Sequence, residues 1–131
     1  MRNLTLIVAA LVLFLASPLH ADDAPKDTAG KTLYHVVSLK FKEHTTPDQM
    51  KPIEEAFAAL KTKIPGITSL NWGTNVSPEH HDKGFTHCFV LTFASAKDRD
   101  AYLTHDEHKA FAKILGPVMA DVMVIDFWAK E

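Results

Sequence analysis

The sequence predicts an α+β domain with the element order βαββαβ, in which a four-stranded antiparallel sheet carries its helices on one face. Four short segments alternate side chains with the period of two that is typical of β-strands. Two longer segments repeat apolar residues at helical spacing, and they follow the first and third of the predicted strands. The folded domain is assigned to residues 32–131, a length that suits one domain.

The first strand is predicted over residues 33–42, which are rich in β-branched and aromatic side chains. One alternating set is the more apolar throughout: His35, Val37, Leu39 and Phe41. The helix that follows starts at Thr46 as N-cap, with Pro47 in the first helical position and Gln49 placed for a capping box. The Pro-Gly pair at 65–66 ends this helix.

Two strands are predicted next, over residues 67–76 and 85–93, joined by a polar loop. His87 shares a strand face with apolar neighbours. Cys88 is the only cysteine, so no internal disulfide can form, and we expect it to be a core thiol. Trp72 is assigned to the core or to a contact between copies of the chain.

The second helical pattern covers residues 95–120 and is expected to break near Thr104-His105. Its core candidates are Tyr102, Leu103, Phe111, Ile114 and Leu115. A fourth strand is predicted over residues 121–128. The βαββαβ order is that of a ferredoxin-like fold.

The N-terminus has the pattern of a secretory signal peptide in residues 1–21. Arg2 precedes a short apolar run, and a small residue, Ala21, precedes the predicted cleavage site. The run is shorter than the about 20 apolar residues that span a bilayer, although an uncleaved anchor is the alternative. We therefore expect a secreted or periplasmic protein in which residues 22–31 form a flexible lead-in.

The net charge and the distribution of apolar residues on the strands indicate which partners to expect. Without Arg2, 13 basic side chains stand against 16 acidic ones, a net charge of −3. That balance argues against nucleic acid as a partner, and no basic helix face suggests membrane binding after removal of the signal. The predicted strands carry apolar residues on both faces, so the face away from the helices needs a cover. The simplest cover is the same sheet of a second copy, which predicts a twofold homodimer.

Proton-transfer chemistry is suggested by residues 100–108, which hold Tyr102, His105 and His108. Imidazoles titrate near neutral pH and a phenol hydroxyl donates or accepts a hydrogen bond, so no cofactor is needed. His35 and His87 on the strands join His105 as candidate ligand-binding residues, because buried histidines need polar partners. The alternative is structural: Tyr102 packs in the core and His108 caps or packs a helix.

A metal site is a weaker reading of the same histidines. His105 and His108 are three residues apart, so they share a face if their segment is helical, and His35 and His87 could add ligands. However, the chain has neither a cysteine pair nor a His-Glu-x-x-His pattern. We expect no metal and no other cofactor.

Short motifs spaced along residues 33–128 resemble those of the stress-responsive A/B barrel family. They are Tyr34 to Lys42, Ile64 to Ile67, Asn71 to Gly73, Gly84 to His87, Tyr102 to His108, and Ile125 to Phe127. The resemblance implies a dimeric α/β barrel. The chain also resembles a plant polyketide cyclase of this family, which closes a ring by aldol condensation without a cofactor. The resemblance implies that Tyr102 matches the catalytic tyrosine of that enzyme and that His108 matches its catalytic histidine. Strand histidines of that enzyme fall at His35 and His87.

Three functions follow from these observations. The first is an exported protein that binds a small apolar or aromatic molecule in a pocket between sheet and helices. The second is a cofactor-independent lyase, cyclase or isomerase with His108 as base and Tyr102 as hydrogen-bond donor. The third is a non-catalytic, self-associating stress protein without a ligand.

Overall fold

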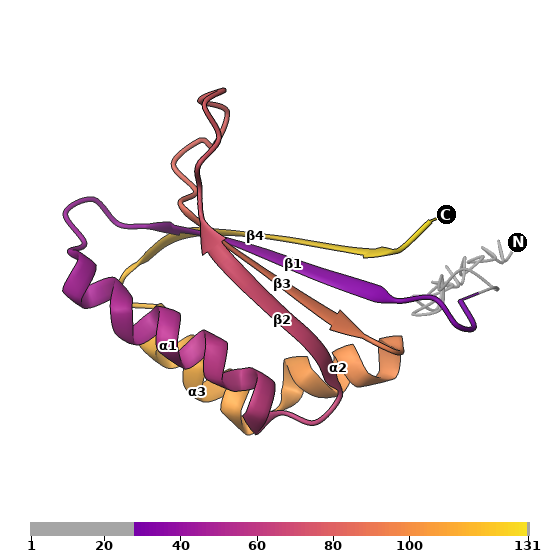
Figure 1. Ribbon diagram of the computed structural model, residues 1–131. Coiled ribbons are helices and arrows are strands. Elements are labelled where there is room, and N and C mark those ends of the chain that lie inside the picture. The colour runs from indigo at the N-terminus through magenta and orange to yellow at the C-terminus, as the bar shows by residue number, and fades with distance from the viewer. Residues whose placement is uncertain (1–27, 131) are drawn as a thin grey trace, which may run out of the picture.

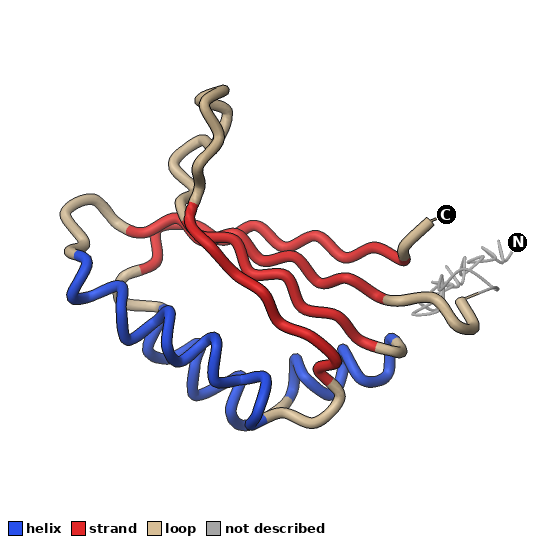
Figure 2. The backbone as a smooth tube through the Cα atoms, viewed as in Figure 1, coloured by secondary structure: helices blue, strands red, loops and turns tan. Residues whose placement is uncertain are grey.

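The computed structural model describes residues 28–130 and forms one four-stranded antiparallel sheet with three helices on one face (Figure 1, Figure 2). The elements in chain order are β1 (Leu33–Phe41), α1 (Pro47–Lys63), β2 (Ile67–Thr74), β3 (His87–Phe93), α2 (Ala96–Thr104), α3 (Asp106–Leu115) and β4 (Met119–Trp128). The predicted ferredoxin-like α+β fold is confirmed. The predicted signal peptide lies outside the described residues.

Strand β1 lies inside the sheet, whose strand order is β2-β3-β1-β4. It pairs antiparallel with β3 and β4, and the register places His35 opposite both Leu91 and Asp126. Cross-strand partners point to the same side of a sheet. The register therefore brings an imidazole and a carboxylate together on the side that the helices cover.

Helix α1 begins as its sequence predicts. The Thr46 hydroxyl accepts from the Gln49 backbone N–H, and the Gln49 side chain accepts from the Thr46 backbone N–H. This reciprocal capping box satisfies two backbone donors that the first helical turn leaves free. The helix ends at Lys63, and Gly66 takes a φ of 96°, which turns the chain into β2.

The helical segment after β3 breaks at His105, as predicted, because its backbone is extended there with φ −67° and ψ 142°. It ends at Leu115 rather than at residue 120, since Gly116 and Pro117 follow and Pro117 has no backbone N–H to donate. Leu103 is 41% exposed and Ile114 is 46% exposed. The prediction that these two side chains belong to the core is wrong, because the break changes which face of each helix meets the sheet.

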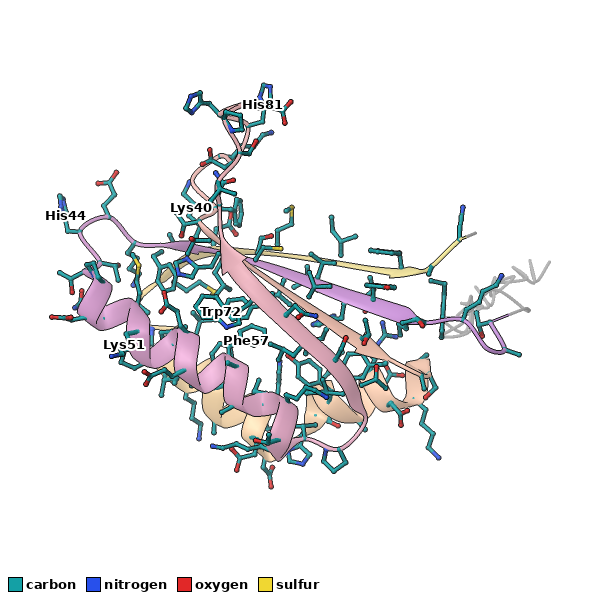
Figure 3. All side chains as sticks on the ribbon, in the orientation of Figure 1. Lys40, His44, Lys51, Phe57, Trp72 and His81 are labelled. Carbon is teal, nitrogen blue, oxygen red and sulfur yellow. The ribbon has the colours of Figure 1, made fainter. Side chains whose placement is uncertain are left out.

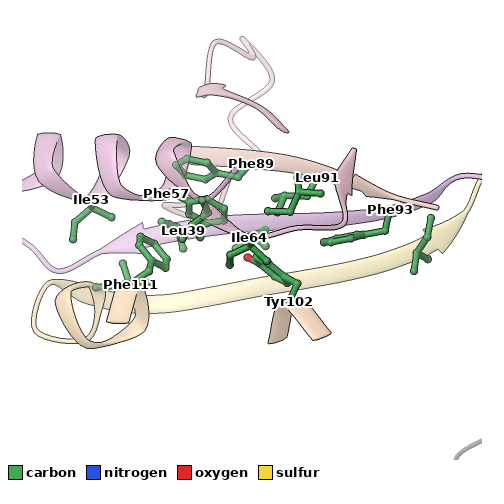
Figure 4. Packing of buried hydrophobic residues seen from close by; sticks show 14 of the residues in the cluster. Leu39, Ile53, Phe57, Ile64, Phe89, Leu91, Phe93, Tyr102 and Phe111 are labelled. Atoms are coloured by element: carbon green, nitrogen blue, oxygen red, sulfur yellow. The ribbon is translucent and has the colours of Figure 1, made fainter. Parts of the chain in front are cut away.

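The core lies between the sheet and the helices (Figure 4). Phe57 of α1 stacks on Phe89 of β3 with a centroid distance of 3.9 Å, and Phe111 of α3 meets Phe57 edge to face at 4.7 Å. Offset and edge-to-face contacts of this kind stabilise aromatic clusters beyond the area they bury. The cluster joins α1 and α3 to the middle of the sheet, with Tyr102 of α2 at its side.

Nothing within residues 28–130 covers the other face of the sheet, which we call the open face. Three large apolar side chains of β4 are about half exposed on it: Met123 at 45%, Ile125 at 53% and Phe127 at 46%. Cys88 is also exposed. Its expected core position is wrong, because Cys88 alternates with the buried His87 and Phe89 and so points to the open face.

Two further features complete the fold. Residues 75–86 form a loop that rises away from the sheet, with His81 near its tip (Figure 1, Figure 3). None of the helices within residues 28–130 is both long and apolar enough to cross a membrane.

Candidate functional site

A cavity of about 560 Å³ lies between the helices and the half of the sheet formed by β1 and β4. Helix α3 packs against α1 and α2, which leaves space beside β4. We call this space the helix-face cavity. Its lining is mostly apolar: Val37, Phe57, Leu103, Phe111, Ala112, Leu115, Met119, Val122 and Val124. Four polar residues also line it: His35, Tyr102, His108 and Asp126.

His35 and Asp126 form a hydrogen-bonded pair at the polar end of the helix-face cavity. Nδ1 of His35 lies 2.6 Å from Oδ1 of Asp126. The imidazole is 4% exposed, whereas the carboxylate side chain is 23% exposed. A carboxylate at Nδ1 orients an imidazole ring and selects its tautomer. Among residues 28–130, Nε2 of His35 has no hydrogen-bond partner, while none of the buried polar side-chain atoms there is unpartnered. Nε2 is therefore accessible from the cavity.

Tyr102 packs its ring in the core while its hydroxyl remains available to the cavity. The residue is 1% exposed, and its ring centroid lies 5.5 Å from that of His35 and 5.4 Å from that of Phe93. Within the described chain its hydroxyl makes no hydrogen bond and is not among the buried atoms. Burial, with a smaller contribution from the charge of Asp126, raises the pKa of the Tyr102 phenol well above its ordinary value. The phenol thus stays protonated and can donate a hydrogen bond.

His108 meets Tyr102 edge to face, with ring centroids 4.7 Å apart. On an unbroken helix, six residues correspond to about 600° of rotation, so the two side chains would point to different sides. The extended backbone at His105 lets both line one cavity. Burial and the nearby His35 ring lower the pKa of His108, partly offset by a hydrogen bond involving the Leu103 backbone.

Arg99 lies behind the polar end of the helix-face cavity and is not part of its lining. Its Nη1 donates to Oδ2 of Asp126, and its Nε donates to Oδ1 of Asp100 at 2.7 Å. Burial disfavours the guanidinium charge, but the two carboxylates outweigh that effect and raise the pKa of Arg99. Asp126 therefore stands between a permanent cation and an imidazole.

The structure places His87 away from the helix-face cavity. It is 4% exposed, and its Nε2 lies 2.8 Å from Oε1 of Glu54 while its Nδ1 lies 2.8 Å from Oγ1 of Thr86. Trp72 stacks over its ring at 6.2 Å. Trp72 is 40% exposed, so it does not belong to the core of the single chain, and its alternative role in a contact between copies stays a prediction. Both ring nitrogens of His87 have partners, so the local geometry describes a satisfied polar link between α1 and β3.

His105 acts as the N-cap of α3. Its Nδ1 accepts a hydrogen bond of 3.1 Å from the Glu107 backbone N–H. It does not line the helix-face cavity. The histidine spacing that suggested a shared helix face does not apply, since His105 has non-helical geometry while His108 lies inside α3. Residues 28–130 also contain no group of three or more His, Cys, Asp or Glu side chains arranged to hold a metal ion.

Two residues of this site, Asp126 and Arg99, were not among the sequence candidates. Asp126 carried a signal, because it alternates with Val122, Val124 and Trp128 on one strand face, where a carboxylate needs a buried partner. Arg99 carried none, since an arginine on a polar helix turn usually lies in solvent. The register between β1 and β4 was needed to bring Asp126 to His35.

Comparison with known proteins places the chain among related sequences. The family model described as the stress responsive A/B barrel domain matches residues 33–129. The stress-response A/B barrel domain-containing protein HS1 of Arabidopsis thaliana is 32% identical over 71% of this chain and 85% of that protein. Olivetolic acid cyclase of Cannabis sativa is 26% identical over 74% of this chain and 96% of the relative. The structure of a hydroxynitrile lyase from Passiflora edulis superposes with a TM-score of 0.71 and 25% identity, covering 77% of this chain and 95% of that one.

Proposed function

We propose, from the premise that this chain belongs to the stress responsive A/B barrel domain family, that it binds a small, largely apolar molecule with one polar end. The observation that carries the proposal is the composition of the helix-face cavity. Four polar side chains, His35, Tyr102, His108 and Asp126, gather at one end of a space that is otherwise apolar. A pocket of this build takes up apolar ligands and orients them by a few polar contacts.

The cavity limits what the ligand can be. About 560 Å³ lies within the range of pockets for single small molecules. Phe57, Phe111 and Val124 offer apolar contact to an alkyl chain or an aromatic ring. At the polar end, the Tyr102 hydroxyl stays protonated and can donate to a carbonyl or hydroxyl oxygen. A highly anionic ligand does not fit, because the lining offers no lysine or arginine to pair with it.

A second candidate function is cofactor-independent acid–base catalysis in the same cavity. The lowered pKa of His108 keeps its imidazole neutral near pH 7, the form that accepts a proton. The raised pKa of Tyr102 keeps its phenol protonated, the form that stabilises a developing oxyanion by hydrogen bonding. Two relatives with named activities, one a cyclase and one a lyase, favour this candidate over a purely structural role.

Native mass spectrometry of the gently purified protein tests the binding proposal first. A discrete extra mass that is lost in Val124→Arg is expected, because this substitution places a charged side chain in the apolar lining. His80→Ala, in the exposed loop, is the matched control and should keep the extra mass. Loss of the extra mass in both variants, or its absence from wild type at every protein concentration, contradicts the proposal.

Cleavage of mandelonitrile into benzaldehyde and hydrogen cyanide, in which a base removes the hydroxyl proton and cyanide leaves, is a direct probe of the catalytic candidate. We expect His108→Ala and Tyr102→Phe each to lower any rate by about 10²–10⁴-fold, the usual contribution of one positioned acid or base. Retention of the full rate in both variants would remove them from the chemistry. A bound extra mass without turnover would indicate a protein that binds its ligand but does not catalyse a reaction of it.

Self-association and export complete the proposed function. The half-exposed apolar side chains of the open face, such as Ile125 and Phe127, support a homodimer that covers this face. The N-terminal pattern through Ala21 supports export with cleavage after that residue. N-terminal sequencing of the protein from its native compartment tests the second point, because a mature chain is expected to begin at Asp22.

A further inference from the structure

A chain of three side chains leads from α2 to the polar end of the helix-face cavity. Arg99 donates from Nη1 to one carboxylate oxygen of Asp126, and the other oxygen lies 2.6 Å from Nδ1 of His35. The two contacts use different oxygens of one carboxylate, so they do not compete. Arg99, Asp126 and His35 come from three different elements, α2, β4 and β1.

The charges in this chain determine which atom carries the proton. A guanidinium has only donors, so the Asp126 carboxylate meets Arg99 as a hydrogen-bond acceptor. An ionised carboxylate has only acceptors, and His35 must therefore present Nδ1–H to Asp126. In the neutral ring Nε2 then holds a lone pair. Because Nε2 is accessible from the cavity, the ligand meets an acceptor there.

We propose that Arg99 is a positioning residue which, through Asp126, fixes His35 in the Nδ1–H tautomer and so presents Nε2 as a hydrogen-bond acceptor to the ligand. This inference rests on the proposed function of the helix-face cavity. It narrows the ligand class to molecules whose polar end carries an O–H or another donor. An apolar molecule with only an ether oxygen leaves Nε2 without a partner.

Arg99 is needed because Asp126 alone is not confined. The Asp126 side chain is 23% exposed and lies on an edge strand, so without the guanidinium its carboxylate can turn toward solvent. The Arg99 fork is itself held, since its Nε donates to Asp100 while its Nη1 donates to Asp126. A planar group with two bound donors restricts the carboxylate more than a single flexible cation does.

The tautomer of His35 can be measured without any activity, by two-bond ¹H–¹⁵N correlation spectra of the histidine rings. Wild type is expected to show the Nδ1–H form of His35, assigned by the signals that vanish in His35→Gln. Arg99→Gln should give a mixture of the two neutral tautomers, and Arg99→Lys should restore most of the Nδ1–H form. Lys97→Gln is the matched control, because it removes one positive charge from the same helix without a contact to Asp126.

Two outcomes overturn the proposal. An Nε2–H tautomer in wild type contradicts the whole chain of contacts, and this reading is available even where a variant fails to fold. An Arg99→Gln spectrum identical to that of wild type shows that Asp126 needs no positioning. A spectrum that changes equally in Lys97→Gln assigns the effect to net charge instead of to contact and overturns the proposal as well.

A ligand pair tests the consequence for recognition. The probes are 4-butylphenol and its methyl ether, which differ in the hydroxyl donor. Wild type is expected to bind the phenol about five- to tenfold more tightly, the discrimination expected from one hydrogen bond, and Arg99→Gln should reduce this ratio toward one. Equal binding of both probes by wild type contradicts the acceptor role of Nε2. If neither probe binds, the function proposed for the cavity fails, while the tautomer spectra still decide the role of Arg99.

Discussion

Tyr102 and His108 lie edge to face with their ring centroids 4.7 Å apart, although one lies in the last turn of α2 and the other in the first turn of α3. The contact exists because the backbone at His105 is extended and redirects the chain between them. The pair thereby holds a protonated phenol and a neutral imidazole side by side at the cavity. Residues that serve this pair and residues that only support the fold should therefore respond differently to substitution.

Alkaline stability should depend on Tyr102. Its pKa is raised in the folded state, so above its ordinary value of 10.0 the unfolded chain releases a proton that the folded chain retains. The free energy of unfolding therefore falls as the pH rises beyond about 10, and it continues to fall until the folded phenol ionises. We expect Tyr102→Phe to lack this loss. Urea unfolding of both proteins between pH 9 and pH 11 measures this difference. If the free energy of unfolding changes with pH in the same way in both proteins, the raised pKa of Tyr102 is contradicted.

Stability in acid should depend on His108, and here the loss of stability occurs as the pH falls. Its pKa is lowered in the folded state, so below the ordinary value of 6.5 the unfolded chain takes up a proton that the folded chain does not. The free energy of unfolding falls as the pH drops through this window and stops falling once the folded imidazole is protonated. His108→Gln should show a smaller acid loss than wild type. A histidine C–H titration by NMR supplies the pKa of His108 itself, and a value above 6.5 would contradict the prediction.

His105 should behave as a helix cap. Replacing it with Ala removes the acceptor for the Glu107 backbone N–H and should cost about 1 kcal/mol of unfolding free energy. His105→Asn supplies another good cap and should restore most of that loss. Both variants should retain the extra mass seen by native mass spectrometry, since His105 does not line the cavity. Loss of the ligand in His105→Asn with full stability would instead make His105 a binding residue.

His87 should matter for stability more than for binding. His87→Leu leaves the partly buried Glu54 carboxylate without its partner, and we expect a loss of about 1–3 kcal/mol. Adding Glu54→Leu removes the unpaired acceptor and should recover part of the loss. Chemical denaturation of the two variants checks this. A double variant no more stable than His87→Leu alone would indicate a different role for the pair.

The open face predicts concentration-dependent assembly. Ile125→Lys places a charge in the most exposed part of the apolar surface and should convert a dimer into a monomer. Glu79→Lys, in the exposed loop, adds a lysine away from that face and serves as control. Sedimentation velocity at several concentrations measures the species. A wild-type protein that sediments as a monomer at every concentration would contradict the proposed dimer.

The sequence predicted the elements well wherever local chemistry decides them. The capping box at Thr46, the break near His105 and the alternation of β1 all depend on neighbouring residues. Errors arose where tertiary packing decides. Ile114 has helical spacing but faces solvent, and Cys88 sits in an apolar strand but points to the open face.

The candidate site was only partly accessible to sequence reasoning. Tyr102 and His108 were singled out together, although their meeting depends on the angle at the helix break. His35 was named without its partner, because the pairing with Asp126 spans 91 residues and depends on strand register. His87 and His105 looked equivalent to His35 in the sequence, yet each has a local partner outside the helix-face cavity.

The two faces of strand β4 belong to two different candidate sites. Val122 and Val124 line the helix-face cavity, while Met123 and Ile125 alternate with them on the open face. If the open face pairs with a second copy, β4 lines both the helix-face cavity and the dimer interface, so a shift of this strand alters both. Ligand affinity and dimer affinity would then be thermodynamically linked, each altered by the other by the same factor. If the dimer binds the ligand more tightly than the monomer does, dilution of the protein would weaken ligand binding without any change to the residues of the cavity.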